Sequence, residues 1–229
     1  MPINIALDGP VGAGKSTIAD AVASRLGILH LDTGAMYRAI GLAALRAGIS
    51  PSDEDAVTAL CGRVDVGVAH QPDGQHTLLD GEDVTGLIRT EEVSMAASTV
   101  AKFAGVRRAM VAVQQRLAAT TDMLVDGRDI GLRVLPDAPV KIFLTASPES
   151  RARRRLLDLK EKGIEESFEK VLEDIILRDE QDTKRAAAPL KQAEDAVLVD
   201  SSELGFDETF AVLCDIVVQR FALDQEDRA

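Results

Sequence analysis

The amino-acid sequence predicts an α/β fold in which helices cover the faces of a parallel sheet. Short apolar segments of strand length alternate along the chain with longer segments of helical period. Two stretches depart from this order: residues 64–80 alternate with a period of two, and residues 151–185 are highly charged. We therefore expect a parallel-sheet core that carries two insertions, the first a small antiparallel sheet and the second helical.

The first third of the chain is expected to alternate strongly between strand and helix. Ile18, Val22 and Leu26 fall on one helical face, whereas the runs around residues 5 and 30 are short and apolar. Gly48 is a stop signal for the helix before it. The expected elements are a strand at 3–7, a helix at 16–26, a strand at 28–31, and helices at 33–47 and 52–62.

The period changes at residue 64. Val64, Val66 and Val68 alternate with more polar or smaller residues, and 71–74 supplies a turn, which predicts a hairpin at about 64–80. Ser147 is a candidate N-cap, with Pro at the first helical position. The remaining expected elements are helices from about 91 and at 106–119, strands at 123–125 and 140–144, a helix from 148, a strand at 196–199, and a closing helix striped by Phe210, Leu213, Cys214, Val217 and Phe221.

Composition excludes several classes of protein. The 229 residues include 26 Lys and Arg against 38 Asp and Glu, a net charge of −12, and only 3% aromatic residues. A general nucleic-acid binder needs the opposite charge balance and aromatic platforms for stacking. No apolar run approaches the roughly 20 residues of a membrane-spanning helix, and the first residues lack a signal-peptide pattern. The two widely separated cysteines could form a single disulfide but favour a reduced protein. We therefore expect the cytoplasm as location, and neither nucleic acid nor membrane as partner.

A phosphate-binding motif follows the first strand. Residues 9–16, Gly-Pro-Val-Gly-Ala-Gly-Lys-Ser, fit G-x-x-x-x-G-K-[ST] between a predicted strand and a predicted helix. Glycines allow successive N–H groups to turn toward one anion, and the helix dipole adds to this. Lys15 would reach the β- and γ-phosphates, and the Ser16 hydroxyl would face Mg²⁺. We expect ATP to bind at Gly9, Pro10, Val11, Gly12, Ala13, Gly14, Lys15, Ser16 and Thr17; the alternative is a glycine-rich turn that only caps a helix.

Other motifs narrow the class of this P-loop protein. GTPases carry an Asn-Lys-x-Asp motif. The only asparagine here is Asn4, which is not part of such a motif, so the usual GTPases are excluded. Transporter ATPases carry Leu-Ser-Gly-Gly-Gln, and Ser-Gly occurs nowhere in the chain. Asp126, which ends a predicted strand, could be a Walker B acid, so a mechanical ATPase stays open at this point.

Arginines at loops and element ends favour phosphate-to-phosphate transfer. Such a transfer needs several cations, because the transition state spreads negative charge over its oxygens. A phosphate acceptor is already ionised and needs no general base, which fits the absence of a plausible catalytic histidine: His30, His70 and His76 lie in a strand and beside a hairpin turn. The arginines in question are Arg38, Arg107, Arg128, Arg178 and Arg185; Arg151, Arg153, Arg154 and Arg155 could equally form a solvated helix face.

The chain resembles the bacterial cytidylate kinases from end to end. A P-loop is common to many families, but LDTGAMYR at 31–38 together with DGRDIG at 126–131 is far narrower. The other matching stretches are GPVGAGKST at 9–17, IRTEEV at 88–93, ASTVA at 97–101, LPDAPVKIFL at 135–144 and RDEQDTKRAAAPL at 178–190.

The resemblance implies roles for individual residues. Arg38 and Arg128 would hold the phosphate of the monophosphate, and Thr33, Arg107 and Asp129 would address the cytosine. A carboxylate can accept from the exocyclic amine, and an arginine can donate to the ring acceptors. Positions near the pentose are matched by Ser98, Arg178 and Asp182, although Arg178 and Asp182 could also be a simple i, i+4 surface ion pair. Arg185 would be a lid arginine, and Lys15, Arg128, Arg178 and Arg185 would act on the transferring group.

The resemblance also implies an organisation and an activity. It implies a P-loop NTPase core with a five-stranded parallel sheet (1–33, 107–150 and 186–229), a monophosphate-binding region (34–106) that includes the hairpin, and a helical lid (151–185). It implies ATP-dependent phosphorylation of CMP and dCMP with Mg²⁺ by a monomer. The alternatives are a UMP or AMP kinase of the same fold, and a non-enzymatic binding module switched by ATP.

Two residues depart from the family pattern, and one segment is expected to move. Leu132 stands where the family usually has Thr, and Ala104 where it usually has Pro; neither change removes a charged group. The segment 151–185 is too polar for a core, yet it contains Arg178 and Arg185. We therefore expect it to be a lid that is mobile without ligands and closes over bound nucleotides.

Overall fold

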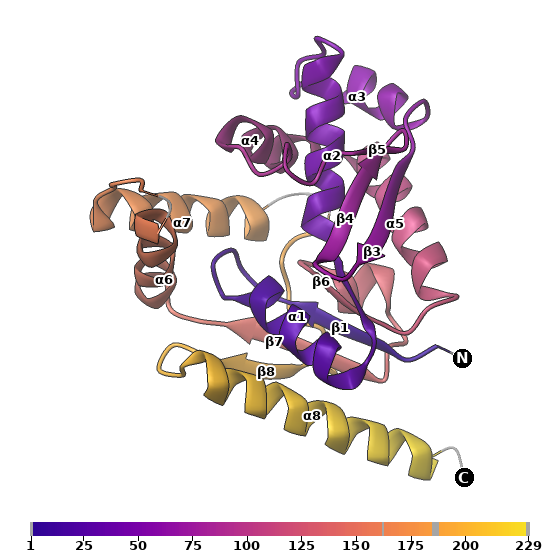
Figure 1. Cartoon of the computed structure of the whole chain (residues 1–229), viewed down its shortest axis with the longest axis vertical. Helices are drawn as coiled ribbons and strands as arrows, with labels where there is room; N and C mark the ends of the chain where they lie inside the picture. The colour runs from indigo at the N-terminus through magenta and orange to yellow at the C-terminus, as the bar shows by residue number, and fades with distance from the viewer. Residues whose placement is uncertain (1, 162, 185–187, 228–229) are drawn as a thin grey trace. The chain divides into compact units, whose positions relative to one another are not determined.

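The computed structural model of the chain describes residues 2–161, 163–184 and 188–227 (Figure 1). These residues divide into two compact units, one formed by residues 1–3 and 28–125 and the other by 4–27 and 126–229. The division into core, monophosphate-binding region and lid stays a prediction.

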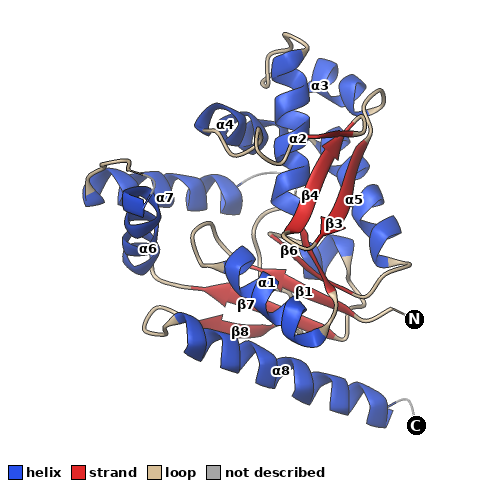
Figure 2. Cartoon of the chain, viewed as in Figure 1, coloured by secondary structure: helices blue, strands red, loops and turns tan. Residues whose placement is uncertain are grey.

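A five-stranded sheet has the order β2-β6-β1-β7-β8. Figure 2 shows its neighbouring strands β1, β7 and β8 in red. Its strands are β1 (Asn4–Asp8), β2 (Leu29–Asp32), β6 (Met123–Gly127), β7 (Val140–Thr145) and β8 (Val197–Asp200). The strand β7 pairs in parallel with β1 on one side and with β8 on the other. Ile5, Leu7, Ile142 and Leu144 are almost completely buried, as expected of a parallel sheet covered on both faces. The predicted parallel sheet is confirmed.

In the unit of residues 4–27 and 126–229, helices α1 (Lys15–Leu26) and α8 (Phe206–Asp227) pack on the sheet. The helix α1 contacts both β1 and α8, and α8 contacts β7. Leu213 and Val217 on α8 are buried, and Cys214 is half-buried. Cys61 and Cys214 are free thiols, and no helix of the described chain combines the length and apolarity needed to cross a membrane.

The helices α6 (Pro148–Glu161) and α7 (Phe168–Lys184) pack against each other (Figure 1). Ala152, Val171 and Ile175 are buried between them, with Leu156, Leu159, Phe168 and Leu172 partly buried around these three. The expectation that this charged segment contains no core is therefore wrong. The segment buries a small apolar stripe of its own, and its charged residues cover the rest.

The unit of residues 1–3 and 28–125 is built on helix α2 (Thr33–Arg46). Asp32 begins this helix, since its Oδ1 accepts from the Ala35 N–H at 3.0 Å. The helix packs against α4 (Glu91–Val100) and contacts α3 (Glu54–Cys61) and α5 (Ala104–Ala118).

The antiparallel sheet of this unit contains β3 (Val66–Gln71), β4 (Gly74–Leu79) and β5 (Glu82–Asp83). Val66 pairs with Leu79, and Gln71 pairs with Gly74, so Pro72 and Asp73 form the turn. The predicted hairpin is confirmed. The short strand β5 was not expected, because two acidic residues carry no strand pattern.

Candidate functional site

The loop between β1 and α1 forms an open cradle at a helix N-terminus. Gly9 has a φ of 152°, and a Cβ there would lie 1.9 Å from the Leu144 carbonyl oxygen, so only glycine fits. Gly14 takes the N-cap position of α1 in the left-handed region, with a φ of 84° and no side chain to cap the helix. The first N–H groups of α1 can therefore bind an anion, as the motif predicts.

Lys15 is buried beside this cradle. Its Nζ donates to the Pro10 carbonyl oxygen at 2.7 Å, and only 6% of the residue is exposed. Burial lowers the pKa of Lys15 to about 7, and the charge of Arg128 adds to this effect, whereas Asp126 and Asp8 oppose it. A bound polyphosphate would supply the negative charge that this ammonium group lacks.

Ser16 and Asp126 form an oxygen pair at the end of the loop. The Ser16 hydroxyl donates to Asp126 Oδ2 at 2.7 Å, and Asp126 is buried on β6. The described residues include no group of three or more His, Cys, Asp and Glu that could hold a metal ion. A hydroxyl and one carboxylate nevertheless fit Mg²⁺, which completes its octahedron with water and substrate phosphates. The interpretation of Asp126 as a Walker B acid agrees with this pairing.

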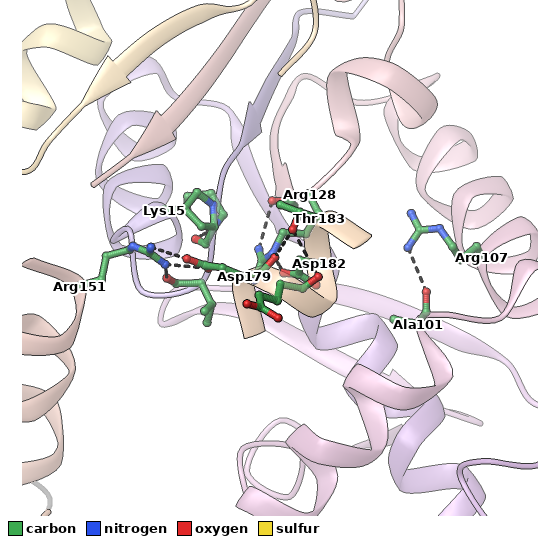
Figure 3. Close-up of polar contacts among 12 residues, drawn as sticks. Lys15, Ala101, Arg107, Arg128, Arg151, Asp179, Asp182 and Thr183 are labelled. Atoms are coloured by element: carbon green, nitrogen blue, oxygen red, sulfur yellow. Dashed lines mark hydrogen bonds and ion pairs between the residues drawn. The ribbon is translucent and has the colours of Figure 1, made fainter. Parts of the chain in front are cut away.

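The turn after β6 carries Arg128 and Asp129. The Arg128 Nε donates to Asp182 Oδ2 at 2.9 Å, and a second nitrogen donates to the Gly127 carbonyl oxygen at 3.2 Å (Figure 3). Asp129 is 5% exposed and borders a cavity of about 360 Å³ that Leu132, Arg133, Ala188, Pro189 and Lys191 also line. Asp129 thus lies beside a cavity, and Arg128 precedes it in the chain. The departure Leu132 lines this cavity.

Asp8 is a residue of this region that the sequence reasoning missed. It ends β1 directly before Gly9, and its carboxylate accepts from the N–H groups of Ile130 and Gly131 at 2.7 and 2.8 Å. These two residues begin η1, a π-helical turn over Ile130–Val134. The available signal was a charged residue at the end of an otherwise apolar strand.

Arg151 was also missed as a buried group. Its guanidinium forms a two-bond ion pair with Asp179 on α7, at 2.9 and 2.5 Å (Figure 3). It also donates to the carbonyl oxygens of Ala146 at 2.8 Å and Val11 at 3.0 Å. This one side chain therefore joins the phosphate-binding loop, the residue after β7, and α7.

The alternative that the four arginines at 151 and 153–155 form a solvated helix face fits only two of them. Arg153 and Arg155 are exposed, whereas Arg151 is buried and Arg154 is half-buried with bonds to Ser201 and Leu204. That interpretation is wrong for Arg151 and Arg154.

The predicted pentose and lid residues lie on or beyond α7, apart from Ser98. Arg178 is exposed, and Asp182 pairs with Arg128. Asp182 thus has a partner that the alternative of an Arg178–Asp182 surface pair did not include. Arg185 lies outside the described residues.

The other unit carries Thr33, Arg38, Ser98 and Arg107. The Arg38 guanidinium donates to Asp32 Oδ2 at 2.7 Å, and its buried Nε has no hydrogen-bond partner within the described chain. Arg107 is 7% exposed, lies 5.5 Å from the Tyr37 ring centroid, and donates to the Ala101 carbonyl oxygen (Figure 3). Thr33 is buried at the start of α2, and Ser98 is exposed on α4.

The cradle at Gly9–Gly14, the buried Lys15 and the Ser16–Asp126 pair define a P-loop protein that binds nucleotides. A family model described as cytidylate kinase matches residues 5–220. Cytidylate kinases from Caldicellulosiruptor bescii and Shouchella clausii are each 50% identical to the chain. The first match covers 90% of this chain and 91% of that protein, and the second covers 93% and 95%.

The chain belongs to the cytidylate kinase family and is an enzyme of this type. Among solved structures, a shikimate kinase from Bacteroides thetaiotaomicron matches with a TM-score of 0.48 and 13% identity, over 94% of this chain and 98% of that one. A likeness at that distance does not bear on the substrate.

Proposed function

We propose that this enzyme transfers the γ-phosphoryl group of ATP to CMP, and also to dCMP, in the presence of Mg²⁺. The observation that carries the proposal is the buried Lys15 beside the glycine cradle, in a chain whose relatives are cytidylate kinases along almost their whole length. A polyanion in the cradle would favour the charged form of Lys15, which burial disfavours.

On the donor side, residues 9–17 bind the phosphates of ATP. The N–H groups at the start of α1 and the Lys15 ammonium face the β- and γ-phosphates. Ser16 and Asp126 would hold Mg²⁺, directly or through water, because their oxygens already lie together. The ion supplies neutralising charge to the donor phosphates.

On the acceptor side, Arg38 and Arg128 bind the phosphate of CMP. Both are partly exposed, with 25% and 28% of the side chain accessible, so a ligand can reach them. The Nε of Arg38, which has no hydrogen-bond partner among the residues that the structure describes, is a donor that a phosphate oxygen would satisfy. Arg128 would exchange its bond with Asp182 for a bond to the phosphate.

The cytosine is assigned to Asp129, Arg107 and Thr33. Asp129 borders the cavity after β6, and its carboxylate can accept from the exocyclic amine that uracil lacks. Ser98, Arg178 and Asp182 lie near the pentose in this proposal, and Asp182 would be released from Arg128 when the phosphate binds. Arg185 completes the set of cations.

The transfer itself needs no general base. The accepting phosphate oxygen of CMP is already ionised, so the enzyme has only to align it with the γ-phosphorus and stabilise the charge on the transferring group. Lys15, Arg128, Arg178 and Arg185 are proposed for this role.

The decisive measurement is ADP release with a panel of acceptors, namely CMP, dCMP, UMP, AMP and shikimate. We expect CMP and dCMP to give the largest kcat/KM. Faster turnover of UMP or AMP would contradict the cytosine assignment. ATP binding without turnover of any acceptor would indicate a binding module.

The matched control for this panel is a pair of lysine variants. Lys15→Met should lower kcat about 10²- to 10³-fold, the usual effect of losing a preorganised charged donor. Lys160→Met makes the same change at an exposed position of α6 and should leave kcat unchanged. Near-parental turnover in a folded Lys15→Met enzyme would contradict the assigned role of the loop.

The proposal also covers the compartment, the partners and the oligomeric state of the enzyme. The net charge of −12 disfavours nucleic acid, and both free thiols suit a reducing compartment. We infer a monomeric enzyme of the cytoplasm whose partners are small nucleotides rather than nucleic acid or membranes.

A further inference from the structure

One buried carboxylate connects the end of β1 to the turn that follows β6. Asp8 is 5% exposed, and both of its oxygens are used: Oδ1 accepts from the Ile130 N–H and Oδ2 from the Gly131 N–H. These two N–H groups come directly after Arg128 and Asp129 in the chain. The carboxylate therefore fixes the backbone from which those two side chains extend.

The turn is also packed closely against a second side chain. A Cβ at Gly131 would lie 3.2 Å from Lys141 Cδ and 3.5 Å from Asp8 Oδ2. The backbone at this position thus lies close to both the carboxylate and the stem of Lys141. Such close packing leaves the start of η1 little freedom to shift while both neighbours are in place.

Stability alone does not account for a carboxylate here. Burial raises the pKa of Asp8 to about 6, despite the two N–H groups and the charge of Lys15, which lower it; the charge of Asp129 raises it further. An ionised carboxylate at this position therefore costs folding free energy near neutral pH. What the carboxylate contributes is a fixed backbone position at Ile130 and Gly131, through its two hydrogen bonds.

We propose that Asp8 is a positioning residue for the acceptor: through Ile130 and Gly131 it sets the directions of Arg128 and Asp129. This inference rests on the proposed function, in which Arg128 contacts the phosphate of CMP and Asp129 contacts the base. Asp8 itself contacts neither nucleotide. Its loss therefore weakens acceptor binding most, and it affects the donor loop through the charge that Asp8 places near Lys15.

The test is the variant Asp8→Asn. An asparagine has one carbonyl oxygen and a donating amide group, so only one of the two N–H groups keeps an acceptor and the other faces a donor. We expect the KM for CMP to rise about tenfold, the size of effect seen when a hydrogen bond to a charged group is lost. The KM for ATP should rise less than the KM for CMP, because the effect of Asp8 on the donor loop is that of its charge near Lys15.

Asp137→Asn is the matched control, because Asp137 is exposed just beyond the same turn. It should leave both KM values unchanged. An equal rise of both KM values in Asp8→Asn, or an unchanged KM for CMP, overturns the inference. If the parental enzyme itself fails to use CMP, the proposed function fails instead, and the two failures are distinguishable.

Hydrogen exchange on the parental enzyme gives an answer even if Asp8→Asn does not fold. The amides of Ile130 and Gly131 should be strongly protected without ligands, and CMP should raise their protection more than ATP does. Exchange of these amides at the rate of an exposed loop, or equal responses to the two nucleotides, overturns the inference.

Discussion

Lys15 and Asp8 show that this enzyme keeps charges where folding disfavours them. The pKa of Lys15 falls to about 7, so its contribution to stability improves as pH rises from about 7 toward the unfolded value of 10.5. The pKa of Asp8 rises to about 6, so stability falls as pH rises from 3.8 to about 6. Both shifts disfavour the charged form, and bound phosphates would relieve the cost at Lys15. The two charges therefore lower the stability of the empty protein, and a bound ligand would offset part of that loss.

The proposed contact of Asp129 with cytosine predicts a change in specificity. Asp129→Ala should lower kcat/KM for CMP about tenfold more than for UMP, because uracil presents a carbonyl where cytosine presents the amine. Parallel measurements of kcat/KM with the two nucleotides check this. Equal losses for both would indicate that Asp129 only organises its loop.

At the scale of elements, periodicity and motifs predicted most of the fold. Every core strand and most helix positions follow from apolar runs and stop signals, and the hairpin from its alternation. The π-helical turn η1 and the Asp8 contact could not be found in this way. That contact joins residues more than a hundred positions apart, and no local pattern encodes it.

The same limit applies to the candidate site. The glycine cradle and Lys15 are local in sequence and were predicted with their neighbours. The partners of Arg128 and Arg151 depend on how α7 packs, which the alternation of charges along that helix does not reveal. The apolar stripe inside the charged segment was hidden by the many charges around it.

The contact between α3 and α5 requires a glycine. A Cβ at Gly105 would lie 2.2 Å from Thr58 Cγ2 and 2.6 Å from Thr58 Oγ1. Gly105→Ala should therefore destabilise the enzyme by about 1–3 kcal/mol, as overpacking usually does. Denaturant unfolding measures this change. Combining Gly105→Ala with Thr58→Ala should recover part of the loss; strict additivity of the two variants would contradict the clash.

The antiparallel sheet contains a pH-sensitive pair of contacts. His76 bonds Asp83 at 2.6 Å and Asp73 at 2.9 Å, and these bonds raise the pKa of the histidine, with Asp83 the larger cause. Its stabilising contribution is complete below the unfolded pKa of 6.5 and is lost as pH rises through the higher folded value.

Hydrogen-exchange protection factors of β3 and β4 should therefore fall as pH rises above 6.5. His76→Gln should remove this dependence, because glutamine does not titrate. An NMR titration that placed the pKa of His76 at or below 6.5 would contradict the prediction.

At the scale of the whole molecule, the proposed lid must move while its interior stays packed. Val171 and Ile175 are buried within the α6–α7 pair, so we expect the pair to close as a body rather than fold on binding. ATP and CMP together should raise hydrogen-exchange protection over residues 163–184, and ATP alone should raise it less. Protection of β1 and β7 should stay constant. Equal and strong protection of α7 with and without both nucleotides would indicate a preformed, immobile segment.

The contacts of Arg151 restrict which segments can be exchanged between related kinases in a chimera. Its side chain lies against the phosphate-binding loop, where a Cβ at Gly12 would come within 3.4 Å of Arg151 Cβ. Its guanidinium at the same time binds the loop through Val11 and α7 through Asp179. Arg151 and Asp179 therefore have to be exchanged together. A chimera that joins a foreign α6–α7 pair to this loop will keep these contacts only if the donor segment supplies both the arginine and its carboxylate.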